Sequence, residues 1–201
     1  GTYAYVAATN AHRLTIVDIS NPKTPTIVSS IGDSVLLQTP KSLFADGRYV
    51  YVAAANASRL SIVDISDPAS PVVVGTIVDE EKLKTPRSVV VVGTYAYVAA
   101  QGAERLTVLD VSNPASPTIA GSVKSTKLKG AVSVAISGTY AYVAAADVNS
   151  VTTVDISNPK EPFVAGSVVN TPKLEGVESI ALSGNYVYAV TSKTDYMTVI
   201  D

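Results

Sequence analysis

The feature that most constrains the fold is a repeat of about 46 residues that runs through the whole chain. A period in the forties, built of short apolar segments separated by turn residues, is typical of β-propeller blades. We therefore predict an all-β propeller in a single domain, made of four-stranded antiparallel blades, of which about four and a half are present. Five glycines mark the register, Gly1, Gly47, Gly93, Gly138 and Gly184, and the repeats are 1–46, 47–92, 93–137, 138–183 and the partial 184–201.

Four strands can be assigned within the first repeat, at residues 1–8, 13–19, 25–31 and 41–46, each bounded by Gly, Asn, Asp or Pro. Residues 1–8 alternate tyrosine with alanine or valine, which is the period of a strand covered on both faces. Ten of the eleven tyrosines belong to such Tyr-x-Tyr pairs. We expect their rings to pack between blades rather than to stack on a ligand.

A second recurring phrase is VDISNPKTP at 17–25, which returns at 63, 109 and 154 and which we call the brace. Its aspartate and asparagine side chains have the length needed to accept hydrogen bonds from turn amides. A calcium site would need several convergent oxygens in one loop, so we expect a structural role and no metal. The repeated aspartates are Asp18, Asp64, Asp110, Asp155 and Asp201.

A serine also recurs on the last strand of each repeat, five residues before a marker glycine. A nucleophilic serine would need a base, and the only histidine, His12, lies in a loop without counterparts. We therefore expect these serines to form bracing hydrogen bonds between strands, and His12 to be a solvated loop residue. The serines are Ser42, Ser88, Ser133 and Ser179.

Composition excludes several classes of function. A net charge of −2 gives no broad basic surface for nucleic acid, and the apolar runs are too short to enter a membrane as helices. The chain has no cysteine, which excludes disulfides and thiol chemistry. No cofactor motif is present, and we expect no cofactor.

The segments LTIVD (14–18), LSIVD (60–64) and LTVLD (106–110), each followed by a brace, resemble the LVIVD repeat family. VTTVD (151–155) and MTVID (197–201) are similar, and the YVTN-type repeats of surface-layer propellers are related. The resemblance implies a cell-surface or extracellular scaffold without catalytic residues, with any signal peptide outside this segment. We expect the chain to be a segment of a larger propeller.

Two sets of loops vary between repeats, and both should lie on one face of the disc, opposite the braces. Variable loops on an invariant scaffold are where a recognition surface is expected. Basic residues at equivalent positions there could bind carboxylate or sulfate groups of a protein or glycan. Alternatively, each arginine covers a tyrosine or pairs with Asp79, Glu80 or Glu81. The candidate binding residues are Arg13, Arg59, Arg105, Lys41 and Arg87.

These patterns favour a non-catalytic propeller scaffold that binds a protein or glycan through its variable loops. One alternative is a structural subunit of a surface layer or filament, formed by self-association. Another is a hydrolase or lyase whose site lies in the central channel and uses Asp46, Glu175 or Glu178 with residues outside this segment.

Overall fold

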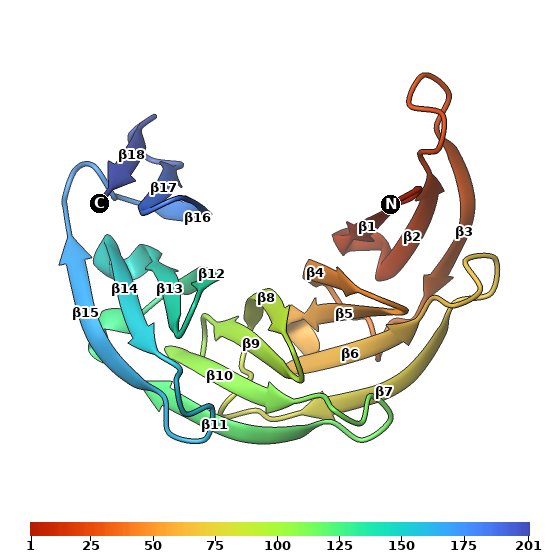
Figure 1. The fold of residues 1–201 in the computed structure, drawn as a ribbon, viewed down its shortest axis with the longest axis horizontal. Helices are drawn as coiled ribbons and strands as arrows, with labels where there is room; N and C mark the ends of the chain where they lie inside the picture. The colour runs from red at the N-terminus through yellow and green to blue at the C-terminus, as the bar shows by residue number, and fades with distance from the viewer.

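The computed structural model describes residues 1–201 and has the shape of an arc, with five sheets arranged around it and the two termini at its ends (Figure 1). We number the sheets as blades 1 to 5. The strands are β1 Tyr3–Ala8, β2 Arg13–Asp18 and β3 Thr26–Gly32 in blade 1; β4 Pro40–Asp46, β5 Tyr49–Ala54, β6 Arg59–Asp64 and β7 Val72–Val78 in blade 2; β8 Pro86–Val92, β9 Tyr95–Ala100, β10 Arg105–Asp110 and β11 Thr118–Lys124 in blade 3; β12 Ala131–Ser137, β13 Tyr140–Ala145, β14 Ser150–Asp155 and β15 Phe163–Val169 in blade 4; β16 Val177–Ser183, β17 Tyr186–Thr191 and β18 Met197–Ile200 in blade 5.

All strand pairs are antiparallel, and blades 2, 3 and 4 each have four strands, whereas blades 1 and 5 have three. The predicted all-β propeller of four-stranded blades is confirmed. Each full blade begins with the last strand of one repeat and ends with the third strand of the next. The strands β4, β8, β12 and β16 line the inner side of the arc, and β3, β7, β11 and β15 form its outer rim (Figure 1).

Apolar side chains meet between neighbouring blades, so the core is a series of layers rather than one centre. At the first junction, Leu14 and Ile16 of blade 1 pack against Val52 and Ile65 of blade 2. The same arrangement recurs at the next three junctions. Members of the tyrosine pairs pack in these layers as predicted, and Tyr51 is buried in one of them. Stability therefore depends mainly on contacts between adjacent blades.

The recurring serines join the inner strands of neighbouring blades. The backbone N–H of Val89 donates to Ser42 Oγ at 3.3 Å. The equivalent bond runs from the next two blades at 3.2 Å in each case, to Ser88 and to Ser133. The predicted bracing role of these three serines is confirmed, and we call them the staple serines.

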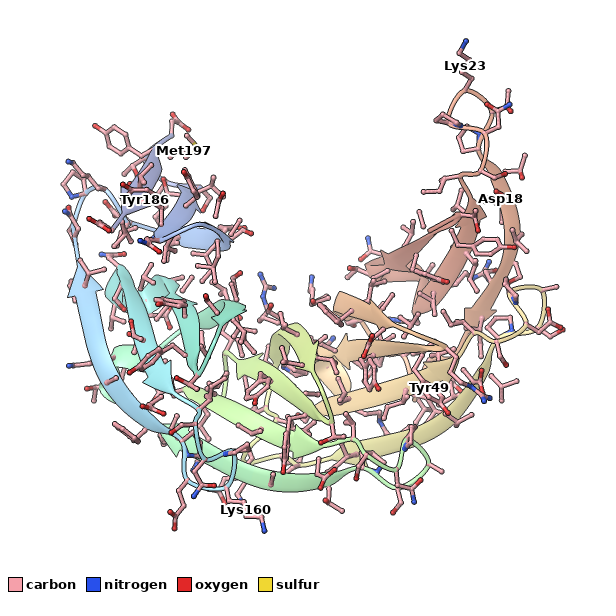
Figure 2. All side chains as sticks on the ribbon, viewed as in Figure 1. Asp18, Lys23, Tyr49, Lys160, Tyr186 and Met197 are labelled. Carbon is pink, nitrogen blue, oxygen red and sulfur yellow. The ribbon has the colours of Figure 1, made fainter.

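The braces perform the same task at the outer rim. Ser29 on β3 donates from Oγ to the carbonyl oxygen of Pro68, 2.6 Å away, in the brace of the next blade. Glycine occupies the equivalent position in blades 2 and 3, where the next brace lies so close that a Cβ on Gly75 would approach Pro114 O to 2.0 Å. Figure 2 shows two brace loops extending outward, with Lys23 and Lys160 on them. Neighbouring blades are thus tied at both their inner and outer strands.

The helices are four short 3-10 turns, η1 Thr9–Ala11, η2 Ala55–Ala57, η3 Thr126–Leu128 and η4 Ala146–Val148. No helix in the structure has the length and apolar character needed to span a bilayer.

Candidate functional site

The loops that connect successive blades carry a shared anchor despite their differing sequences. One leucine in each loop is fully buried beneath it, and these are Leu37, Leu83, Leu128 and Leu174. These loops are therefore fixed to the scaffold at one point, and only the residues around the leucine vary in chemistry.

Two residues after each buried leucine, the backbone adopts the left-handed conformation, with φ between 52° and 70°. Its carbonyl accepts a hydrogen bond of 2.9–3.1 Å from the residue that follows the second strand of the same blade. This bond joins the two variable loop sets, so the prediction that they share one face is confirmed. The left-handed residues are Thr39, Thr85, Gly130 and Gly176.

His12 has a defined partner, contrary to the prediction that it is a solvated loop residue. Its Nδ1 accepts a hydrogen bond of 2.9 Å from the backbone N–H of Thr39. Asn149 occupies the equivalent place in blade 4, and its Oδ1 accepts from the N–H of Gly176 at 3.3 Å. His12 therefore holds a loop in position.

A β-bulge lies at the start of each inner strand from blade 2 to blade 5, immediately before the recurring serine. A bulge leaves one residue out of the ladder and can redirect its side chain. Three of these bulged residues, from three successive blades, line one cavity of about 410 Å³ on the variable-loop face. They are Arg87, Val132 and Glu178, and the bulged residue of blade 2 is Lys41.

Polar side chains from the adjoining loops complete the cavity. Asp147 lies across Gly130, where a Cβ would come within 2.6 Å of its Cγ, and the stem of Lys193 lies across Gly176 in the same way. Glycine at these two left-handed turns thus leaves room for a charged side chain to lie across the turn. In blades 2 and 3 the equivalent residues are Thr39 and Thr85, whose side chains occupy that space. The remaining polar residues of the lining are Gln101, Asn149, Glu175 and Ser192.

The charges in this cavity are not neutralised by one another. Both salt bridges of the structure lie elsewhere, between Arg48 and Asp64 and between Arg105 and Glu81. Two cations, on Arg87 and Lys193, and three carboxylates therefore line the cavity without an ion pair. No group of three or more His, Cys, Asp or Glu side chains in the chain is close enough to hold a metal ion.

Of the five predicted binding residues, the structure places only one in the cavity. In three blades the arginine at the start of the strand next to the outermost one donates from one guanidinium nitrogen to a hydroxyl on the outermost strand of its own blade, at 3.0–3.3 Å. Arg105 also forms a salt bridge of 2.6 Å with Glu81, as expected from the alternative in which the arginines pair with acidic residues of the loops. None of these three arginines, Arg13, Arg59 and Arg105, lines the cavity, whereas Arg87 does.

The arginine that covers a tyrosine is Arg48, which the sequence did not single out. Its guanidinium carbon is 5.3 Å from the centre of the Tyr49 ring, and the same side chain pairs with Asp64. The hydrogen bond from Arg48, followed by bonds from Ser66, lowers the pKa of Asp64 to about 2. This cluster lies at the hairpin turn of blade 2, far along the strands from the cavity.

The brace aspartates accept hydrogen bonds from turn amides, as predicted. In four braces the N–H of the serine two residues on donates to the aspartate Oδ1 at 2.8–2.9 Å. Hydrogen bonds from the serine hydroxyl and then from its amide lower the pKa of three of them. These three are Asp18, Asp110 and Asp155.

The three carboxylates proposed for a channel enzyme are not brought together. Glu175 and Glu178 line the cavity, but Asp46 ends strand β4, whose first residue, Pro40, is the end nearer the variable loops. A site that uses Asp46 with either glutamate is therefore excluded by the direction of the inner strand. Sequence reasoning missed Asp147 and Lys193, for which glycine at the two left-handed turns was the only available signal.

Comparison with known families identifies the repeat. The family model described as LVIVD repeat matches residues 1–33, 40–79, 85–125, 130–170 and 176–201. No curated protein matches the sequence.

Several solved structures share the fold at low sequence identity. A Bacteroides fragilis protein provisionally named 6-phosphogluconolactonase is 14% identical, with a TM-score of 0.76 over 98% of this chain and 62% of its own. The periplasmic gluconolactonase of Pseudomonas aeruginosa is 15% identical, with a TM-score of 0.71 over 94% of this chain and 63% of its own. Hydrazine synthase of Kuenenia stuttgartiensis is 18% identical, with a TM-score of 0.68 over 96% of this chain and 54% of its own. This chain thus spans less than two thirds of each of these three proteins.

Proposed function

The chain belongs to the LVIVD repeat family, and from this premise we propose that it is a non-catalytic binding scaffold of an exported or cell-surface protein. Its variable-loop face binds a protein or glycan partner, and the polar cavity on that face contacts charged groups of the partner. A propeller fold is compatible with many activities, so the proposal depends on the site and not on the architecture.

One observation carries this proposal. The cavity contains charged side chains that form no ion pair, presented by loops that are anchored to the scaffold. Unpaired charges at the surface of a folded domain contribute little to its stability. A complementary partner can use them for orientation and for faster association.

The proposal is tested by binding to arrays of glycans and of acidic and basic peptides, with the chain immobilised through its terminus. We expect partners whose binding falls when Arg87 and Lys193 are both changed to Ala. Changing Lys23 and Lys160 to Ala is the matched control, because these lysines lie on braces (Figure 2). Their substitution also removes two positive charges, but away from the cavity. Equal loss in both double variants, or no binding to any array, would contradict a site on the variable-loop face.

Hydrolysis of a lactone is a second candidate, favoured by two carboxylates and an arginine in one cavity. Either glutamate would take a proton from the attacking water, and Arg87 would stabilise the oxyanion that forms at the carbonyl. The name of the Pseudomonas relative suggests gluconolactone as the assay substrate. Turnover that is abolished by Glu175→Gln or by Glu178→Gln would favour the enzyme over the scaffold. A rate equal to the spontaneous one would remove this candidate.

A further inference from the structure

The cavity at the bulged inner strands has an unusual distribution of charge that restricts what it can hold. Arg87 enters it from blade 3, whereas Glu178 enters it from blade 5 and Glu175 from the loop just before blade 5, with Val132 contributed by blade 4. Since no ion pair joins these groups, cation and carboxylates stand more than 4.0 Å apart. The cavity therefore offers one site for an anion and a separate site for a cation.

The lining also excludes other classes of small ligand. Its carboxylates belong to no group of three or more His, Cys, Asp or Glu side chains that could hold a metal ion, so we expect an organic cation there. No aromatic residue lines it, which leaves no surface for stacking a sugar ring or a base. Its apolar residues are only Val132, Ala146 and Val177, so it offers little apolar surface to a large hydrophobic group.

We propose that this cavity binds a small zwitterion, with the carboxylate of the ligand on Arg87 and its ammonium group on Glu175 and Glu178. The inference rests on the proposed binding function and names the ligand chemistry of the same site. A guanidinium donates two parallel hydrogen bonds to a carboxylate, and an ammonium group donates to carboxylate oxygens. At about 410 Å³, the cavity has room for an amino acid or a dipeptide.

Lys193 and Asp147 adjust the two ends of the site. The Lys193 side chain lies across Gly176, and the Asp147 side chain lies across Gly130. Because glycine has no side chain, it leaves room for each of them beside the cavity. The cavity thus has three carboxylates and two cations, and its net charge favours a ligand whose ammonium group is well exposed.

Titration calorimetry with ω-amino acids of increasing chain length, from glycine to 6-aminohexanoate, measures the spacing between the two charges. We expect one length, or glycylglycine, to bind at least about tenfold more tightly than acetate and butylamine, which each carry a single charge. Binding should weaken with added salt, and CaCl₂ should not compete. Equal binding of the single-charge probes, or no binding of any probe at about 10 mM, would overturn the proposal.

Variants assign the ends of the ligand. Arg87→Ala and Glu178→Gln should each weaken the best zwitterion by about tenfold or more, whereas Arg87→Lys should retain part of the affinity. Lys41→Ala is the matched control, because Lys41 is the bulged residue of blade 2 and does not line the cavity. Thermal melting verifies that each variant is folded, and a loss equal to that of Lys41→Ala would count against the site.

The failure of this inference is distinguishable from failure of the proposed function. If no zwitterion binds, yet Arg87→Ala still weakens a protein or glycan found on the arrays, the scaffold function stands and the small-ligand site is refuted. If zwitterions bind and no array partner exists, the cavity serves a small molecule instead of a macromolecule.

Discussion

At the residue scale, the lack of a Cβ atom on glycine allows neighbouring blades to approach each other closely at the outer rim. Gly75 and Gly121 lie under the braces of the following blades, and Ser29 takes the same position in blade 1 by donating a hydrogen bond instead. In blades 1 to 3 the residue at this place therefore lies against the backbone of the next brace, a contact that the sequence of one repeat does not reveal.

A substitution at this position should be costly wherever the next brace is present. In Gly121→Val the new Cβ would lie 2.5 Å from Pro159 O, so the brace must move, and we expect a loss of about 1–3 kcal/mol in the free energy of unfolding. Gly166→Val is the control, because nothing lies within 4 Å of a Cβ there. Urea denaturation measures both, and equal losses would disprove the close contact as the cause.

We predict that the folded protein loses stability in acid because a brace aspartate, Asp64, has a lowered pKa in the folded state. The folded pKa of Asp64 is lowered to about 2, and an unfolded aspartate titrates near 3.9, so its contribution is complete above about pH 4 and lost as pH falls towards 2. We expect the melting temperature to drop over this window and the drop to shrink in Asp64→Asn. Asp46→Asn, which removes an exposed carboxylate from the other strand that pairs with β5, serves as the control. An unchanged acid profile in Asp64→Asn would contradict the assignment.

The roles of aspartate and serine were predictable, because each residue type recurs at one place and has few options there. The role of His12 was not, since its counterpart in blade 4 is an asparagine that shares only a hydrogen-bond acceptor at a similar reach. The sequence therefore did not reveal this repeated hydrogen bond, because a different residue type accepts it in each of the two blades.

At the scale of the element, the inner strands are joined to one another through single hydroxyl groups. The predicted strands agree with the observed ones to within about one or two residues at their ends, because alternation and turn residues define them locally. The fixed leucines and left-handed turns of the variable loops were not predicted, because their significance depends on the blades above and below.

Removing one staple should weaken one junction. In Ser133→Ala the N–H of Ile180 would be left buried without an acceptor, and we expect a loss of about 1–3 kcal/mol. Ser179→Ala is the matched control, because the hydroxyl of Ser179 is exposed and accepts no such bond. Thermal and urea unfolding of the two variants measure the difference. A similar result for both serines would exclude the staple as a source of stability.

At the scale of the whole molecule, the blades at the two ends of the arc are covered on one side only. Met197 and Val199 of blade 5 are 68% and 50% exposed, whereas their equivalents in blade 3, Leu106 and Val108, are fully buried. The period of the sequence predicted the number of blades. The cavity could not be predicted, because it depends on side chains from three blades that are separated by about 45 residues each.

Hydrogen exchange should reveal this difference in cover. Repeat proteins gain stability from the interfaces between units, so we expect the amides of β9 and β13 to exchange at least about tenfold more slowly than those of β1 and β17. Mass spectrometry of peptic fragments provides the measurement, at low protein concentration so that association does not protect the edges. Uniform protection across all blades would mean that the arc opens as one cooperative unit.

The β-bulge at the head of each inner strand also makes the array easy to diversify. The bulged residue is lysine, arginine, valine and glutamate in four successive blades, while the serine that follows it is the same in all four. Because the bulged residue is left out of the strand ladder, a duplicated repeat can acquire a different side chain there by a single substitution that leaves the strand pairing in place. The proposed binding surface would therefore differ between arrays of this repeat through the side chains at the bulges, while the serines that join the inner strands stay the same.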